Sequence, residues 1–225
     1  MKFYALDFDR TLGRTADIAR DFITFVEQED DTIGESLKQQ QQAIEATGGS
    51  FDVIGSLRAQ VGRRVLNMCE SFVVKEHSDT YLEDGADELL DSIQDQGNQM
   101  GILTYGGEDW QMTKLRITHL ESFHRIILQQ KGEKGSLIAS WYDAEREVYQ
   151  LPEALGGGVC REIVLVDDKP VEFEGFPDLP SARGYLYVGG MSPAAVASTR
   201  PAIEGLPANV AVVNSLRDIA QQEAV

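Results

Sequence analysis

Two aspartates, Asp7 and Asp9, follow the first apolar stretch of the chain, in the sequence KFYALDFDRT that begins at Lys2. Side chains two positions apart on an extended chain point to the same side, and at ordinary strand rise their Cα atoms lie about 6.5 Å apart. Two carboxylates so placed can divide a reaction between them, one as nucleophile and the other as proton carrier. The same spacing is also typical of a simple turn, because aspartate favours turns.

Other apolar stretches of the chain also end in polar residues. Stretch 101–104 ends in a threonine, stretch 163–167 ends in paired acids, and a basic turn lies between the two stretches. The residues concerned are Thr104, Tyr105, Lys131, Lys134, Asp167 and Asp168. Each segment alone has an ordinary structural explanation, so their order along the chain is the informative feature.

In this order the segments resemble the four motifs of the haloacid dehalogenase-like (HAD) phosphatase superfamily. The resemblance covers the part of the chain that bears the motifs and leaves out the segment from about residue 13 to about residue 81. A single motif of this kind is a weak signal, but the ordered set is specific.

The resemblance implies a role for each residue of the first motif. Asp7 would attack phosphorus and form an aspartyl-phosphate, which water then hydrolyses. Asp9 would protonate the leaving alcohol and later deprotonate the water. Thr11 is expected to fix the turn after the strand. An acid at the position of Asp9 favours phosphoryl chemistry, because the dehalogenase relatives lack one there.

The resemblance also implies a Mg²⁺ site, since Mg²⁺ prefers oxygen ligands and keeps several waters. Asp7, Asp167 and the backbone carbonyl of Asp9 would bind the ion, and Asp168 would support these ligands more than bind directly. The alternative for the paired acids is a polar turn between strand and loop. A bound cation explains why so many carboxylates would converge.

Two further motifs would contact the phosphoryl group. Thr104 would donate a hydrogen bond to it, helped by backbone amides around Tyr105, although relatives often carry Asn or Ser at the position of Tyr105. Lys134 would offset negative charge. We favour Lys134 over Lys131 because it precedes a predicted helix that begins near Gly135, as the family pattern requires, although Lys131 lies nearer the strand end. The alternatives are a β-branched residue that ends a strand, for Thr104, and solvated loop charges, for the lysines.

Apolar stretches alternate with amphipathic ones along most of the chain, which predicts an α/β fold with a doubly wound parallel sheet. The predicted strands are 2–7, 101–104, 125–129, 163–167, 185–188 and 210–213. The predicted helices of this part are 86–96, 109–120, 137–148 and 215–223, and 191–209 is expected to be a loop or short helix. Ligands of such sheets bind beyond the carboxyl ends of the strands, which is where the motif residues fall.

Residues 14–81 have a helical apolar pattern and interrupt this alternation. The predicted domains are therefore an α/β core of 1–13 with 82–225, and a helical cap of 14–81. A cap that closes over the site would exclude water and contact the substrate. Its basic residues Arg58, Arg63, Arg64 and Lys75 are the candidates for substrate contact.

The composition narrows the class of protein. A formal net charge of −17 argues against nucleic-acid binding, and a phosphate site must therefore be positive locally. No apolar stretch approaches the roughly 20 residues of a membrane span, and no basic-then-apolar leader is expected. Two cysteines without close spacing, Cys69 and Cys160, are expected to be reduced thiols of a cytoplasmic protein. The scattered His77, His119 and His124 are expected at the surface or in packing.

These observations favour a Mg²⁺-dependent phosphatase that acts on a small phosphorylated metabolite. One alternative is a phosphoryl-transferring sugar phosphomutase of the same fold. A second is a catalytically silent binding module, which the intact motifs do not favour. The natural substrate and the oligomeric state do not follow from the sequence.

Overall fold

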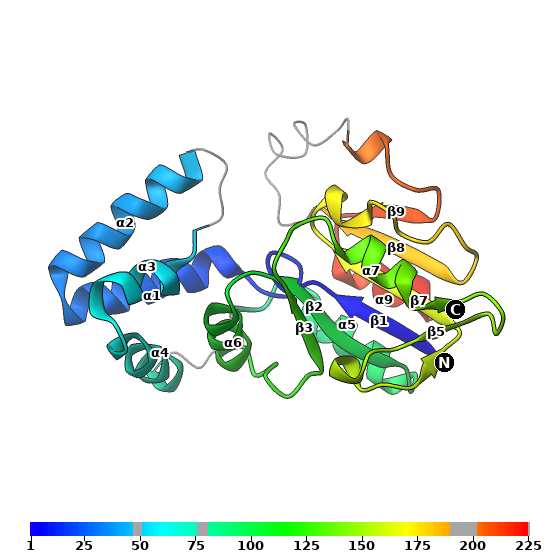
Figure 1. Ribbon diagram of the computed structural model, residues 1–225, viewed down its shortest axis with the longest axis horizontal. Coiled ribbons are helices and arrows are strands. Elements are labelled where there is room, and N and C mark those ends of the chain that lie inside the picture. The colour runs from blue at the N-terminus through cyan, green and yellow to red at the C-terminus, as the bar shows by residue number, and fades with distance from the viewer. Residues whose placement is uncertain (47–50, 76–80, 190–201, 225) are drawn as a thin grey trace. The chain divides into compact units, whose positions relative to one another are not determined.

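A computed structural model describes residues 1–46, 51–75, 81–189 and 202–224 (Figure 1). The chain forms two compact units. The first contains Met1–Gly13, Leu82–Tyr105 and Phe123–Val225, and the second contains Arg14–Tyr81 and Gly106–Ser122.

The first unit is built on a six-stranded parallel sheet with the order β3-β2-β1-β7-β8-β9. The strands are β1 (Lys2–Leu6), β2 (Gln99–Tyr105), β3 (Arg125–Leu128), β7 (Glu162–Asp167), β8 (Ala182–Tyr187) and β9 (Val210–Val213). The order reverses between β1 and β7, and ligands of open α/β sheets bind at such a point. The predicted α/β fold with a parallel sheet is confirmed.

The alternating side chains of β1 contribute to both faces of this sheet. Phe3 and Ala5 belong to a buried apolar cluster that includes Ile138 of helix α7 (Lys134–Ser140). Tyr4 points to the opposite face, where its hydroxyl donates to Glu223 of helix α9 (Leu216–Glu223). Helix α5 (Ala86–Asp95) packs against α9, so helices cover both faces.

One predicted element is wrong. The helix expected over 137–148 ends at Ser140, and the chain continues into a three-stranded antiparallel sheet. Its strands are β4 (Tyr142–Asp143), β5 (Val148–Gln150) and β6 (Val159–Cys160).

Local chemistry explains this hairpin. Asp143 Oδ1 accepts hydrogen bonds from the backbone N–H groups of Glu145 at 3.1 Å and Arg146 at 3.2 Å, which closes the turn. The rings of Tyr142 and Tyr149 then pair across the strands with centroids 5.1 Å apart. The turn-forming aspartate and the cross-strand aromatic pair outweigh the helical spacing of the apolar residues.

The second unit is helical. It contains α1 (Thr15–Glu29), α2 (Asp31–Ala46), α3 (Val53–Val61), α4 (Arg64–Lys75) and α6 (Glu108–Ile117). Phe22 of α1 packs edge-on against Phe72 of α4, with ring centroids 5.0 Å apart, and lies 5.5 Å from the ring of Trp110 on α6. Residues 106–122 therefore pack with this unit, whereas the predicted boundaries placed them in the core.

Three further expectations concern single segments. Most of stretch 191–209, and His77, lie outside the described residues. Cys69 and Cys160 are both buried and free of disulfides. Among the described helices, none is long and apolar enough to cross a membrane.

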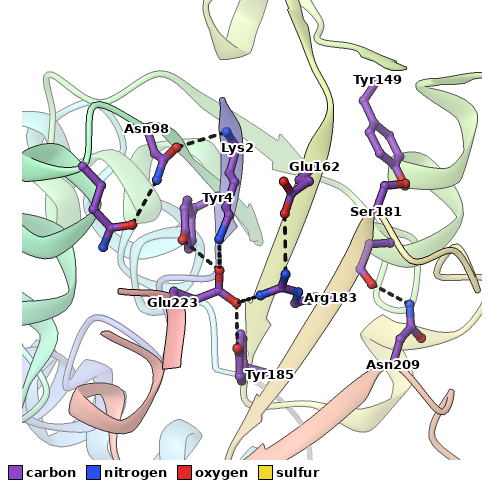
Figure 2. A network of polar contacts seen from close by, with 12 residues as sticks. Lys2, Tyr4, Asn98, Tyr149, Glu162, Ser181, Arg183, Tyr185, Asn209 and Glu223 are labelled. Atoms are coloured by element: carbon purple, nitrogen blue, oxygen red, sulfur yellow. Dashed lines mark hydrogen bonds and ion pairs between the residues drawn. The ribbon is translucent and has the colours of Figure 1, made fainter. Parts of the chain in front are cut away.

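A buried carboxylate ties the last helix to the sheet. Figure 2 shows Glu223 surrounded by side chains of β1 and β8. Its Oε2 lies 2.8 Å from Lys2 Nζ and accepts from the Tyr4 hydroxyl at 3.2 Å. Its Oε1 accepts from Arg183 Nη1 at 2.9 Å and from the Tyr185 hydroxyl at 2.7 Å. Burial alone would raise the pKa of Glu223, but Lys2, Tyr185 and Arg183 together lower it.

Glu223→Gln should lower the free energy of unfolding at pH 7 by roughly 2–3 kcal/mol, because the donors lose a charged acceptor. Since the pKa of Glu223 is lowered in the folded state, its contribution is complete above the unfolded pKa of about 4.3 and is lost as pH falls through the folded pKa. Urea unfolding of both proteins at pH 7 and pH 3 measures this.

Glu162→Gln is the matched control, since Glu162 also pairs with Arg183, at 3.6 Å, but is more exposed. Glu162→Gln should lower the free energy of unfolding by less than about 1 kcal/mol. A Glu223→Gln loss that is equal at both pH values would contradict the assigned role of the charge.

Candidate active site at the carboxyl edge of the sheet

The loop after β1 is a tight turn that holds Asp7 in place. The backbone N–H of Asp7 donates to Val166 O at 2.9 Å and so continues the pairing of β1 with β7. The backbone N–H groups of Thr11 and Gly13 both point to Phe8 O, at 3.3 and 2.8 Å. The Thr11 hydroxyl donates to Asp7 Oδ2 at 3.2 Å. Thr11 thus both fixes the turn and orients the Asp7 carboxylate.

Asp9 and Arg10 lie at the outer side of this turn. Asp9 is half-buried, and Arg10 is exposed. The φ angle of Arg10 is 66°, in the left-handed region, which costs a non-glycine residue roughly 1–2 kcal/mol. The backbone N–H of Arg10 donates to Gly13 O at 2.9 Å, which stabilises the loop in this conformation.

Three carboxylates meet where β1 and β7 end. Leu6 pairs with Val166 in register, so the next residues, Asp7 and Asp167, lie side by side. Asp7, Asp167 and Asp168 are 1%, 0% and 2% exposed, and each offers an oxygen that lies within 4.8 Å of the others. The structure therefore brings Asp7 of the first predicted motif together with Asp167 and Asp168 of the last.

Lys134, at the first turn of α7, compensates this buried charge. It is 1% exposed, and its Nζ lies 2.5 Å from Asp7 Oδ1 and 2.5 Å from Asp167 Oδ2. Burial alone would lower the pKa of Lys134, but Asp167 and Asp7 raise it, so the ammonium stays charged. Burial raises the pKa of Asp167, and the neighbouring Lys134 opposes that rise.

Asp168 has a different partner. Its Oδ1 lies 3.1 Å from Lys169 Nζ in an ion pair. Burial raises the pKa of Asp168 to about 6, although Lys169 counteracts it. Burial alone would lower the pKa of Lys169, but the carboxylates of Asp7, Asp168, Asp167 and Asp9 raise it.

Glu172 is a buried acid of this region that sequence reasoning missed. It lies on the short helix η3 (Pro170–Phe173), and its oxygens accept from the backbone N–H of Gly132 at 3.0 Å and of Lys134 at 3.4 Å. A Cβ on Gly135 would lie 2.4 Å from Glu174 O, so glycine allows α7 to approach η3 closely. Glu172 and Gly135 therefore position Lys134. The sequence signal available was an acid just beyond the last motif.

The second predicted motif lies at the end of β2. Thr104 is buried, and its hydroxyl has no hydrogen-bond partner among the described residues. Tyr105 is half-buried, with Lys131 Nζ 5.8 Å from its ring centroid. The structure thus places Lys134, and not Lys131, against Asp7, while Lys131 lies exposed beside the second motif.

The basic residues predicted to contact substrate belong to the helical unit. Arg58 forms an ion pair with Asp109, and Lys75 Nζ donates to Gln28 Oε1 at 3.0 Å. Arg63 and Arg64 are exposed. Their contact with a substrate stays a prediction.

The residues at the edge fit a divalent cation. Asp7, Asp167 and Asp168 supply only oxygen ligands, which Mg²⁺ prefers, and the oxygens that they offer lie within 4.8 Å of one another. The backbone carbonyl of Asp9 remains a predicted ligand.

Lys134→Met should destabilise the protein by about 3 kcal/mol or more in EDTA, because it leaves Asp7 and Asp167 buried without a counter-charge. Lys131→Met is the control and should cost less than about 1 kcal/mol, since Lys131 is exposed and faces one aromatic ring. Urea unfolding of the two variants gives the comparison. Equal losses would show that Lys134 does not compensate these acids.

No protein-family model matches the chain, and the comparison with curated proteins gives no match either. Solved structures do match it over nearly its whole length. One from Burkholderia xenovorans, described as a haloacid dehalogenase-like hydrolase, is 17% identical with a TM-score of 0.63, over 99% of this chain and 96% of that chain.

Two further solved structures have the same architecture. A protein from Bacillus subtilis described as a HAD hydrolase, solved with bound magnesium, is 16% identical with a TM-score of 0.56, over 100% of this chain and 99% of that one. A protein from Thermotoga maritima described as a β-phosphoglucomutase is 13% identical with a TM-score of 0.54, over 99% of each chain. The chain therefore has the fold of haloacid dehalogenase-like hydrolases, as the ordered motifs predicted.

Proposed function

We propose that this protein is a Mg²⁺-dependent phosphatase of small phosphomonoesters that forms an aspartyl-phosphate on Asp7. The observation that carries the proposal is the group of three buried carboxylates beside Lys134, at the edge where such sheets bind ligands. The magnesium bound to the Bacillus subtilis protein of the same fold supports the choice of ion.

In the first step an Asp7 oxygen attacks phosphorus, and the bond between phosphorus and the ester oxygen breaks. Asp9, a half-buried residue of the same turn, donates its proton to the departing alkoxide. In the second step Asp9 takes a proton from water, the water oxygen attacks phosphorus, and the bond from phosphorus to Asp7 breaks. Inorganic phosphate leaves, and both carboxyl groups return to their first states.

The surrounding residues would stabilise this reaction electrostatically. Bound Mg²⁺ would neutralise charge on the phosphoryl oxygens. The Lys134 ammonium stays charged next to Asp7 and would offset the negative charge that gathers there. Thr11 holds the Asp7 carboxylate in one orientation. The hydroxyl of buried Thr104, which has no hydrogen-bond partner among the described residues, would donate to a phosphoryl oxygen.

A phosphomutase would use the same first step but transfer the phosphoryl group to a second hydroxyl. The likeness to the Thermotoga maritima protein makes this the leading alternative. We favour hydrolysis of a small metabolite in the cytoplasm, with the helical unit as the cap. Two buried free thiols fit a reducing compartment of that kind.

Asp7→Asn should lower Mg²⁺-dependent phosphate release at least about a thousandfold, because a neutral amide cannot act as the nucleophile. Phosphate release from a panel of small phosphomonoesters, with and without Mg²⁺, measures this. Asp95→Asn, at an exposed site of α5, is the matched control. Near-wild-type release by Asp7→Asn would remove Asp7 as nucleophile, and an isomeric sugar phosphate in place of free phosphate would indicate a mutase.

Asp167→Asn should raise the Mg²⁺ concentration needed for half-maximal activity at least about tenfold, because one anionic ligand is lost. Asp168→Asn should raise it less, if Asp168 supports the ligands more than it binds. Titration of activity with Mg²⁺ gives both values. An unchanged Mg²⁺ requirement in Asp167→Asn would exclude Asp167 as a ligand.

A further inference from the structure

Exposed cations stand at the outer rim of the candidate site. Lys131 follows β3, Tyr105 ends β2 and Arg10 follows β1, and these strands are neighbours in the sheet. Their carboxyl ends share one edge, and this edge also carries Asp7 and Thr104. The chain has 37 Asp and Glu residues but only 20 Lys and Arg residues. Two exposed cations at this edge therefore have the sign opposite to the net charge of the chain.

The buried and the exposed cations of this edge differ in their partners. Lys134 and Lys169 form ion pairs with the buried acids, at 2.5 and 3.1 Å. Among the described residues, no carboxylate lies within the 4.0 Å ion-pair distance of the Arg10 guanidinium or the Lys131 ammonium. Lys131 instead faces the ring of Tyr105. Arg10 and Lys131 are thus the rim cations available to an incoming anion.

The backbone of Arg10 gives a second, independent observation. Its φ of 66° is a conformation that glycine adopts freely and that arginine adopts only at a cost. A strained residue persists where the surrounding structure holds it, and such residues gather at ligand sites.

Arg10 and Lys131 lie on the loops that follow the two strands on either side of β2. The Lys131 ammonium lies over the ring of Tyr105, the residue that ends β2. Both side chains are long, exposed cations at the edge of the sheet that also carries Thr104 and Asp7. A guanidinium binds a carboxylate or a phosphate through paired hydrogen bonds, and an ammonium adds a point charge.

We propose that Arg10 and Lys131 bind a second anionic group of the substrate, so that the preferred substrates are phosphomonoesters carrying a carboxylate or a further phosphate. This deepens the proposed phosphatase function and rests on it. A neutral sugar or alcohol phosphate would leave both rim cations unused.

Three compounds of similar size test the proposal. Glycerol 3-phosphate has a neutral end, 3-phosphoglycerate has a carboxylate in place of that end, and glycerol 1,3-bisphosphate has a second phosphate. We expect kcat/KM for one or both of the latter two to exceed that for glycerol 3-phosphate about tenfold, through KM more than kcat. The compound whose kcat/KM exceeds that of glycerol 3-phosphate identifies the second anionic group as a carboxylate or a phosphate.

Arg10→Gln and Lys131→Gln remove each charge at similar side-chain length, and each should reduce this preference at least about threefold. Arg10→Gly is a second variant that removes the side chain without backbone strain, and its preference should fall as well. Arg161→Gln is the matched control, because Arg161 is exposed at the opposite, amino edge of the sheet, just before β7. Thermal unfolding verifies that each variant is folded.

Binding provides a readout that does not depend on turnover. Calorimetric titration of the Asp7→Asn protein should show tighter binding of the second anionic compound than of glycerol 3-phosphate, and Arg10→Gln in that background should remove the difference. Turnover of all three compounds without a preference, or a preference unchanged in the rim variants, would overturn the inference and leave the phosphatase intact. No turnover and no binding of any compound would contradict the proposed function itself, and the inference with it.

Discussion

The burial of Asp7, Asp167 and Asp168 at the ends of two adjacent strands is the constraint on which the rest of this site depends. Removing a carboxylate from water destabilises the folded protein unless the charge is paired with an opposite one. Asp7 and Asp167 share one ammonium at 2.5 Å, and Asp168 has a second at 3.1 Å. The surrounding chain must therefore deliver a lysine to a place that no solvent reaches.

The backbone around the site places both the acids and the lysine. The register of β1 with β7 sets the first two acids side by side. Glu172 holds the turn that leads into α7, and Gly135 lets that helix approach closely enough for Lys134 to reach the acids. The same arrangement places the proposed nucleophile, Asp7, next to the Lys134 ammonium. The contacts that stabilise the buried acids are therefore also the contacts on which the proposed reaction depends.

Much of this could be predicted from the sequence, for physical reasons. The apolar stretches that became β1, β2 and β7 are buried on both faces of a parallel sheet, and such strands are nearly continuous in apolar residues. Polar residues directly after these stretches must fall at the carboxyl edge, which is why Asp7, Thr104 and Asp167 lie together there. Lys134 could be preferred over Lys131 because the family that the motifs resemble carries its lysine just before a helix.

Other features depend on contacts between distant segments, which periodicity does not report. The hairpin after α7 follows from the Asp143 turn and the pairing of Tyr142 with Tyr149, against a helical spacing of apolar residues. The grouping of α6 with the helical unit follows from the packing of Trp110 against Phe22. Glu172 binds backbone N–H groups some 40 residues earlier in the chain, so its place just beyond the last motif does not by itself reveal this role.

Acid-quenched single turnover tests the central claim most directly. Enzyme in excess of substrate is mixed with Mg²⁺, quenched with acid within milliseconds, digested, and its peptides are sequenced by mass spectrometry. The account predicts a transient phosphoryl group on Asp7 that appears before free phosphate and decays as phosphate is released. Release of phosphate with no phosphorylated peptide at any time, or with the phosphoryl group on a different residue, would contradict it.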